Sequence, residues 1–297
     1  MVYKTFLNTV KEKMAAKLGK EYRLILRQVP KNNGMILDGL CITKGDSHIS
    51  SALYLNSCYR QYLGGTSMDE IIDDLLSVYH ANQAPADLDI DLFNRYPAAK
   101  KRLACRLVHA ASNKSLLKNL PHVMWHDLAV VFYLHLRENP DGIMTSSIQS
   151  HHLKLWNISV EELYREAMLN TPLLLPPSIS SIASIMKNLG YKLPDPQPAS
   201  PFYVLTNTSC INGAVCMLYP DVIKHFAENM ECDLIILPSS IHEVLLMPDE
   251  GKADYNELRR LVAFINETEV SSQDRLSDQI YLYSRETEQL LPAPSLL

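Results

Sequence analysis

The densest group of polar side chains that could do chemistry is the run from Ser239 to Glu243, which lies between two apolar segments. Ser240, His242 and Glu243 would offer a hydroxyl, an imidazole and a carboxylate, the groups that hydrolases use for nucleophilic and general-base catalysis. No Gly-x-Ser-x-Gly pattern surrounds the serines, so the strained turn that exposes a nucleophile is not indicated. If residues 242–247 form a strand, His242 and Glu243 point to opposite faces. We therefore favour a packing role for these residues and keep them as the catalytic candidates of an enzyme alternative.

Histidines and cysteines form the second set with possible chemistry, as metal ligands. His151 and His152 are adjacent, and adjacent side chains on a helix point about 100° apart, so they rarely share one ion. The remaining candidates are scattered and contain no Cys-x-x-Cys pair, namely His122, His126, His135, Cys41, Cys58, Cys105, Cys210, Cys216 and Cys232. We expect Cys210 and Cys216 to be free thiols on neighbouring strands. The sequence predicts no metal, no cofactor and no disulfide framework.

Basic side chains could contact phosphate, either in the cluster Lys100-Lys101-Arg102 with Arg95 and Arg106, or in the first helix. Neither of the common glycine-rich phosphate loops occurs in the chain. The net charge of −5 is unevenly distributed, with +6 over residues 1–65, −2 over 66–150, zero over 151–200 and −9 over 201–297. The basic N-terminal region leaves nucleic-acid binding open as an alternative, although the acidic back half is a poor platform for phosphate.

The elements that would position these side chains begin with a helix and a meander. Asn33-Gly34 between two apolar runs indicates a tight hairpin, because both residues tolerate positive φ. Ser67 and Glu70 form a capping box, in which each side chain satisfies a free backbone amide at the start of a helix. The predicted elements are a helix over 3–18, strands over 22–29, 35–43 and 51–55, and a helix over 67–79.

The middle of the chain alternates between short helices and strands. The apolar run 127–136 could be a strand or a helix, and the turn signal at 139–142 favours strand, turn and strand. Ser159 and Glu162 form a second capping box. The predicted helices are 97–103, 113–120, 159–169 and 182–189, and the predicted strands are 105–109, 127–136 and 143–148.

A proline-rich segment at 191–201 predicts a semi-rigid linker between two domains. The domains would be an N-terminal α+β region over 1–190, with a second boundary near 85–95, and a C-terminal βαβ-rich domain over 202–290, followed by a frayed tail over 291–297. In the C-terminal domain we expect strands over 202–206, 213–218, 234–237, 242–247 and 279–283, and helices over 220–227 and 255–266. The predicted fold class is therefore α+β.

The composition supports an ordinary folded protein of 297 residues, with 47% hydrophobic and 21% charged residues. No apolar run approaches the ~18 residues that a membrane-spanning helix needs. The N-terminal residues lack the apolar segment of a secretory signal peptide. We expect a cytoplasmic protein with reduced thiols and no membrane partner.

Several motifs resemble a known family. Lys31-Asn32-Asn33-Gly34 with Leu37-Asp38-Gly39 resembles the opening of an uncharacterised family of ~300-residue proteins from clostridial gut bacteria. Further matches follow in the same order at Leu205-Thr206-Asn207, Cys216-Met217-Leu218-Tyr219-Pro220, Ser239-Ser240-Ile241-His242-Glu243-Val244, Asn266-Glu267-Thr268 and Leu276-Ser277-Asp278. That family is a domain of unknown function, so the resemblance implies no activity, cofactor or site residue.

A more distant resemblance is to an uncharacterised family of bacillar proteins. It rests on Asp127-Leu128-Ala129-Val130, on Leu153-x-x-Trp156 and on the run at 276–278, and it implies an α+β architecture. Without a catalytic signature, we expect a non-catalytic binding or adaptor protein that acts on another protein. The alternatives are an enzyme with an inter-domain cleft, using Ser240, His242 or Glu243, and a nucleic-acid binder.

Overall fold

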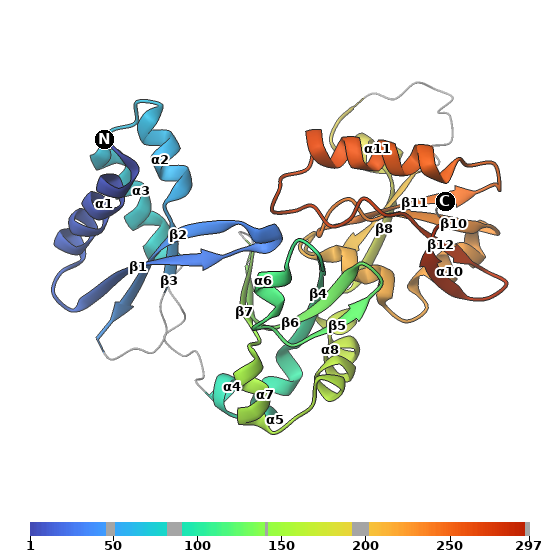
Figure 1. The fold of residues 1–297 in the computed structure, drawn as a ribbon, viewed down its shortest axis with the longest axis horizontal. Coiled ribbons are helices and arrows are strands. Elements are labelled where there is room, and N and C mark those ends of the chain that lie inside the picture. Colours follow the sequence, from blue (N-terminus) through green and yellow to red (C-terminus); the bar gives the residue numbers. More distant parts are fainter. Residues whose placement is uncertain (46–50, 82–90, 140–141, 192–201, 295–297) are drawn as a thin grey trace. The chain divides into compact units, whose positions relative to one another are not determined.

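A computed structural model describes residues 1–45, 51–81, 91–139, 142–191 and 202–294 (Figure 1). The chain divides into two compact units, Met1–Ile90 and Asp91–Leu297. Helices and three antiparallel sheets build these units, so the predicted α+β class is confirmed.

The first unit follows the predicted order of helix, meander and helices. Its elements are α1 (Tyr3–Leu18), β1 (Tyr22–Pro30), η1 (Asn32–Gly34), β2 (Ile36–Lys44), β3 (Ser51–Tyr54), α2 (Asn56–Leu63) and α3 (Met68–Ala81). The hairpin predicted at Asn33-Gly34 is confirmed: both residues have positive φ, 56° and 71°, and Pro30 pairs with Ile36 on either side of the turn. The sheet order β1-β2-β3 makes β1 an edge strand.

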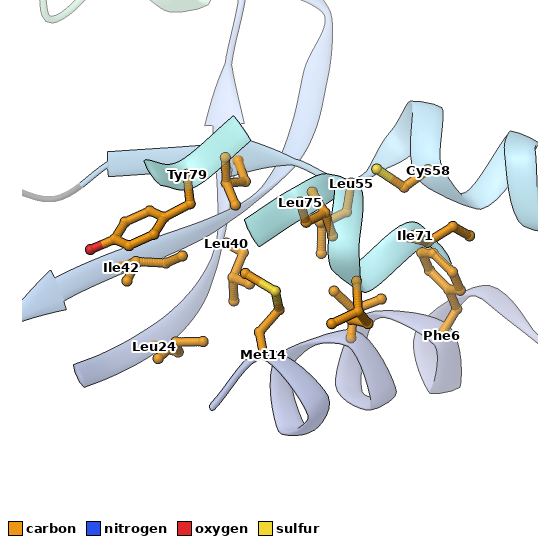
Figure 2. Packing of buried hydrophobic residues seen from close by; sticks show 13 residues of the cluster. Phe6, Met14, Leu24, Leu40, Ile42, Leu55, Cys58, Ile71, Leu75 and Tyr79 are labelled. Carbon is orange, nitrogen blue, oxygen red and sulfur yellow. The ribbon is translucent and has the colours of Figure 1, made fainter. Parts of the chain in front are cut away.

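One continuous core holds this unit together, and it lies on a single face of the sheet. Phe6 and Met14 of α1 meet Leu40 of β2 and Leu75 of α3 (Figure 2). Since strand side chains alternate between faces, the neighbours of these strand residues point the other way. The helices α1, α2 and α3 all contribute to the same core cluster, so the opposite face of the sheet carries none of their packing.

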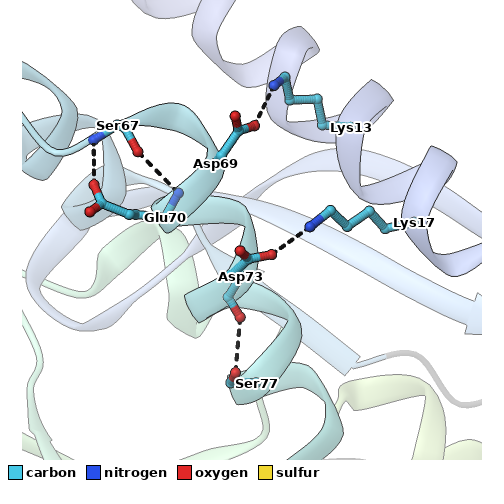
Figure 3. Close-up of polar contacts among 7 residues, drawn as sticks. All are labelled: Lys13, Lys17, Ser67, Asp69, Glu70, Asp73 and Ser77. Carbon is cyan, nitrogen blue, oxygen red and sulfur yellow. Dashed lines mark hydrogen bonds and ion pairs between the residues drawn. The ribbon is translucent and has the colours of Figure 1, made fainter.

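The capping box at the start of α3 is confirmed (Figure 3). The Glu70 amide donates to Ser67 Oγ at 3.2 Å, and the Ser67 amide donates to Glu70 Oε2 at 2.9 Å. Two lysines of α1 pair with α3, Lys13 with Asp69 at 2.6 Å and Lys17 with Asp73 at 2.5 Å. Residues 1–90 hold 10 Lys and Arg and 10 Asp and Glu, so the basic charge of the N-terminal region is balanced within its own unit.

The second unit begins with a sheet centred on β6 (Leu128–Asn139). Strand β4 (Leu103–His109) pairs along one side, and β5 (His122–Trp125) and β7 (Gly142–Ser147) pair along the other. The interpretation of 127–136 as a strand is thus confirmed, and the turn tip at 140–141 lies outside the described residues. The helical segments of this region are α4 (Asp91–Asn94), α5 (Tyr96–Ala99), η2 (Lys100–Arg102), α6 (Lys114–Leu117), α7 (Ser150–Trp156) and α8 (Val160–Leu174).

A six-stranded antiparallel sheet follows, in the order β13-β12-β10-β11-β9-β8. Its elements are β8 (Pro177–Ser181), α9 (Ile182–Asn188), β9 (Tyr203–Asn207), η3 (Gly213–Leu218), α10 (Val222–Met230), β10 (Asp233–Leu237), β11 (Val244–Asp249), α11 (Tyr255–Thr268), β12 (Tyr281–Ser284) and β13 (Gln289–Pro292). Strands and helices alternate along the chain as predicted. The two strands of each strand–helix–strand unit are not neighbours in the sheet, because β11 lies between β9 and β10, and β10 lies between β11 and β12.

Two element predictions in this sheet are wrong. Residues 213–218 form the 3₁₀ helix η3 instead of a strand, because this buried segment crosses between β9 and α10 without a strand partner. The tail predicted as frayed contributes β13, whose residues 289–292 pair with β12. Alternation over four residues is too short a pattern to separate a strand from a tail.

The division between units falls at Ile90/Asp91, inside the second boundary predicted near 85–95. The linker predicted at 191–201 lies, except for Tyr191, outside the described residues. Strand β8 precedes that segment and β9 follows it, and the two strands pair with each other from Pro177↔Asn207 to Ser181↔Tyr203. The proline-rich segment therefore follows α9 and lies, along the chain, between two paired strands of one sheet.

Candidate functional site

The predicted catalytic candidates lie where three loops meet at one end of the six-stranded sheet. Residues 238–243 run between the loop after β9 and the loop before β12. The Ala214 amide donates to Ile241 O at 3.2 Å, and the Ile241 amide donates to Asp274 O at 2.8 Å. Because β10 ends and β11 begins at this end of the sheet, the pairing of those strands fixes the position of the loop.

Within this loop, Ser240, His242 and Glu243 do not converge. The buried Ser240 Oγ accepts the His242 amide at 3.0 Å. The imidazole Nδ1 accepts the Asn212 amide at 3.3 Å, which places the ring proton on Nε2, 3.4 Å from Asp274 Oδ1. Both ring nitrogens thus face structural partners, and neither faces the serine hydroxyl. Glu243 makes no hydrogen bond in the described part of the chain, and it precedes β11 instead of lying on it.

Gly213 lies where these loops pack so closely that no side chain fits. A Cβ added there would lie 2.2 Å from Thr206 Oγ1 and 2.5 Å from His242 O, well inside contact distance. Thr206 Oγ1 in turn donates to His242 O at 2.7 Å. The candidate loop is therefore a tightly packed junction of three loops.

A different polar cluster lies on one face of the β4–β6 sheet. The other face packs on α8, where the Cys105 amide donates to Thr171 Oγ1 at 3.1 Å and the ring of Phe132 meets that of Tyr164. Alternation puts Arg106 of β4 and Tyr133 of β6 on the face opposite to Cys105 and Phe132. Arg106 pairs with Val131, so Tyr133 is its diagonal neighbour, within reach of long side chains.

The polar atoms of this cluster, formed by Arg106, Tyr133 and His135, lack partners within the described residues. The Tyr133 hydroxyl and the His135 Nδ1 are buried without a hydrogen bond. The Arg106 side chain is partly exposed and has neither an ion pair nor a hydrogen bond. Native proteins satisfy most buried polar groups, so a set of three on one face stands out.

Burial governs the electrostatics of this cluster. It raises the pKa of the Tyr133 phenol, lowers the pKa of the Arg106 guanidinium and lowers the pKa of the His135 imidazole. The nearby Cys216 thiol of η3 has a pKa raised to about 12, again mainly by burial. At neutral pH Arg106 is therefore a positive charge beside the neutral Tyr133 phenol and Cys216 thiol, while the charge of Arg102 acts on the neutral His135. Glu138, which also acts on Tyr133, accepts a hydrogen bond from Ser209.

The first unit carries a third polar surface, on the face of its sheet opposite the helices. Arg23, Ile25 and Arg27 of β1 point to this face, and the guanidinium groups have no ion pair within the described residues. The Tyr54 ring of β3 packs over Gly39, and Lys31 Nζ lies 4.0 Å from the centroid of that ring. We call this surface the open face.

The basic cluster noted in the sequence is largely occupied by intramolecular partners. Lys100 pairs with Glu166 at 2.9 Å, Arg95 with Asp91 at 3.1 Å, and Arg102 donates to Leu136 O at 2.8 Å. Within the described residues, Lys101 and Arg106 of that cluster have no partner, and Arg106 is a lone arginine in an otherwise apolar strand.

The histidines and cysteines do not assemble into a metal site in the described ranges, where no group of three or more His, Cys, Asp or Glu could hold an ion. His152 Nδ1 instead accepts the Gln149 amide at 2.9 Å as part of a helix cap. Cys216 is buried in η3, and Cys210 is exposed with a φ of 53°. The prediction that both cysteines lie on strands is therefore wrong. Among the described helices, none is long and apolar enough to cross a membrane.

A family model for a family of unknown function, DUF5688, matches residues 3–285. The chain belongs to DUF5688. The predicted resemblance to a family of unknown function is thereby confirmed over nearly the whole chain, while the clostridial source and the bacillar relationship stay predictions. No curated protein and no solved structure matches this DUF5688 chain, so its function has to be argued from the sites above.

Proposed function

We propose that this DUF5688 protein is a non-catalytic binding protein of the cytosol, and that the edge of β1 pairs with an extended, acidic segment of a partner protein. One observation carries the proposal: β1 is a nine-residue edge strand beside an open face with two unpaired arginines. The six free cysteines suit a reducing compartment.

The backbone of β1 offers the first part of the interaction. In its antiparallel pairing with β2, Lys31 donates to Met35 O and Gly45 donates to Glu21 O, so odd-numbered residues of β1 bond to β2. Leu24, Leu26 and Gln28 therefore present their amides and carbonyls outward. Such a row is a ready template for an added strand.

The open face offers the second part, which is selectivity by charge. A strand added beside β1 would place alternate side chains next to Arg23, Ile25 and Arg27. Carboxylates at these alternate positions would form charge-assisted hydrogen bonds with the two guanidinium groups. Arginines on an edge also oppose pairing between two copies of the chain, since like charges would face each other.

The same surface suits a protein better than a nucleic acid. Single strands need several aromatic rings on which bases stack, and among the described residues Tyr54 supplies the one ring of the open face, already in contact with Lys31. The lysines Lys13 and Lys17 of α1 are paired with carboxylates. The enzyme alternative gains no support from the loop of Ser240 and His242, whose polar atoms face structural partners.

The proposal is tested by capturing partners from a lysate of the producing cells with the full-length protein, and by comparing Gln28→Pro with Gln28→Ala. Proline removes an outward-facing amide without disturbing the pairing with β2, whereas alanine keeps that amide. We expect a specific partner to be retained by wild type and Gln28→Ala and lost by Gln28→Pro. Cross-linking should map the contact to an acidic, extended segment of that partner.

A second pair of variants tests the charge. Arg27→Glu should abolish retention, whereas Arg27→Lys should weaken it by less than about tenfold, because it keeps the charge but loses the bidentate geometry. Retention that is equal in all four variants would overturn the proposal. So would the absence of any protein partner, or the recovery of nucleic acid in its place.

A further inference from the structure

The second unit contains two neighbouring polar side chains that have no partner among the described residues. The side chain of Tyr133 is 2% exposed, and its hydroxyl makes no hydrogen bond to any described residue. Its diagonal neighbour Arg106 is a partly exposed residue on the same face of the sheet. We propose that Arg106 and Tyr133 form a binding site for a small carboxylate.

The cost of leaving these groups unpaired is the first argument. A buried hydroxyl without a partner and a charge without a counter-ion both destabilise a folded protein. Arg102, also near this sheet, bonds to Leu136 O, and Tyr281 in the neighbouring sheet bonds to Asp127. Some comparable groups thus have partners, although the Tyr96 hydroxyl and Asn266 Oδ1 are also buried without a hydrogen bond among the described residues. Arg106 and Tyr133 differ from these in lying next to each other, so that one ligand could pair with both.

The chemistry of the surroundings defines the ligand. One guanidinium and one hydroxyl can together donate to a single carboxylate, the arginine in its bidentate geometry. The neighbouring Cys216 thiol is neutral, and the negative charge of Glu138 also acts on Tyr133. One positive charge beside a carboxylate favours a monoanion over a phosphate dianion.

The apolar neighbours suggest what the carboxylate is attached to. Ala104, Leu174 and Leu175 pack with Tyr133 in one cluster, which Ile143 of β7 joins. A carboxylate with a short apolar group would meet these side chains beyond its charged end. The site thus fits a small aliphatic or aromatic monocarboxylic acid, and it does not depend on the protein-binding surface of the first unit.

The test uses benzoate, butyrate and inorganic phosphate as probes on the full-length protein. Both tryptophans, Trp125 and Trp156, lie in the second unit, so tryptophan fluorescence follows its unfolding by urea. Benzoate or butyrate at millimolar concentration should shift the urea midpoint upward, because ligands that bind only the folded state stabilise it. Phosphate at the same ionic strength should shift it less.

Two variants and a control decide the outcome. Arg106→Met should weaken carboxylate binding at least about tenfold while folding normally, since it removes an unpaired charge and keeps a similar volume. Tyr133→Phe should weaken binding by about threefold to tenfold, and His122→Gln on the neighbouring strand β5 should change it little. No shift with any carboxylate would overturn the proposal. Equal shifts in wild type and Arg106→Met, or a phosphate shift as large as the benzoate shift, would overturn it as well.

Discussion

Two buried tyrosines of the second unit differ in whether the hydroxyl has a hydrogen-bond partner. Tyr281 is fully buried, and its hydroxyl donates to Asp127, which also accepts Ser277 Oγ at 2.5 Å. Tyr133 is equally buried, and its hydroxyl has no partner among the described residues. Neither outcome could be predicted from sequence, because a partner such as Asp127 for Tyr281 comes from a distant segment of the chain. The candidate loop at Ser240 could be located from sequence, whereas the diagonal contact of Arg106 with Tyr133 depends on strand register.

This difference predicts opposite effects of one substitution. Tyr281→Phe should destabilise the second unit by about 1–2 kcal/mol, because it leaves an Asp127 oxygen without its donor. Tyr133→Phe should leave the unliganded protein unchanged or stabilise it by up to about 1 kcal/mol, because it removes an unsatisfied hydroxyl. Urea unfolding followed by tryptophan fluorescence measures both. Equal destabilisation by the two substitutions would show that Tyr133 has a partner.

Buried tyrosines also predict how stability depends on alkaline pH. Burial raises the pKa of Tyr281, Tyr133 and Tyr219 above the ordinary value of about 10. Above that pH the unfolded chain loses phenolic protons that the folded chain keeps, so stability is full below pH 10 and falls as the pH rises further. The slope can reach about 1.4 kcal/mol per pH unit for each such tyrosine.

The measurement is the urea midpoint between pH 9 and 11 for wild type and two variants. Tyr219→Phe should reduce the loss of stability over this range, since one titrating phenol is removed. The exposed Tyr191 provides the control, and Tyr191→Phe should keep the wild-type slope. A slope that is identical in both variants would contradict the assignment.

At the scale of elements, the sequence predicts correctly the turns and helix starts that depend on neighbouring residues. It does not predict the segments whose structure depends on tertiary contacts. The hairpin at Asn33-Gly34 and the capping box at Ser67 and Glu70 depend on adjacent residues alone, and both are present. The apolar segment 213–218 is predicted as a strand from its composition, but it packs in the fold as the 3₁₀ helix η3. Strand β13 is held by its pairing with β12, for which a sequence offers no direct signal.

The capping box makes a prediction on helix α3. Ser67→Ala should destabilise the first unit by about 1 kcal/mol, because the Glu70 amide loses its acceptor. Ser77 on the same helix donates to Asp73 O in mid-helix (Figure 3). Ser77→Ala should be neutral or slightly stabilising, since alanine favours helix interiors. Hydrogen exchange of the α3 amides measures both, and equal protection in the two variants would contradict the role of the cap.

At the scale of the whole molecule, the proline-rich segment shows what composition says about the connection between two elements. Prolines mark a connection that is not regular structure, but they do not report which elements the connection joins. Here it joins β8 to β9 in one sheet. The charge asymmetry along the chain has a similar explanation in the first unit, where the lysines of α1 pair with the carboxylates of α3.

The two units predict how the chain can be divided. Fragments 1–90 and 91–297 should each unfold cooperatively in urea, because each has its own core. A division at 191–201 should fail, because fragment 202–297 loses β8 and the bonds that Ser277 and Tyr281 make to Asp127. Circular dichroism and NMR dispersion test this. A well-folded fragment 202–297 would restore the boundary predicted from the prolines.

The central claim is that the edge of β1 binds an extended partner segment, and residue-resolved hydrogen exchange tests it most directly. The full-length DUF5688 protein is compared with and without its captured partner. The account predicts at least about tenfold slower exchange at the outward amides of Leu24, Leu26 and Gln28, with little change at the amides of Ile25 and Arg27, which already bond to β2. Unchanged exchange at the three outward amides in the presence of bound partner would contradict it.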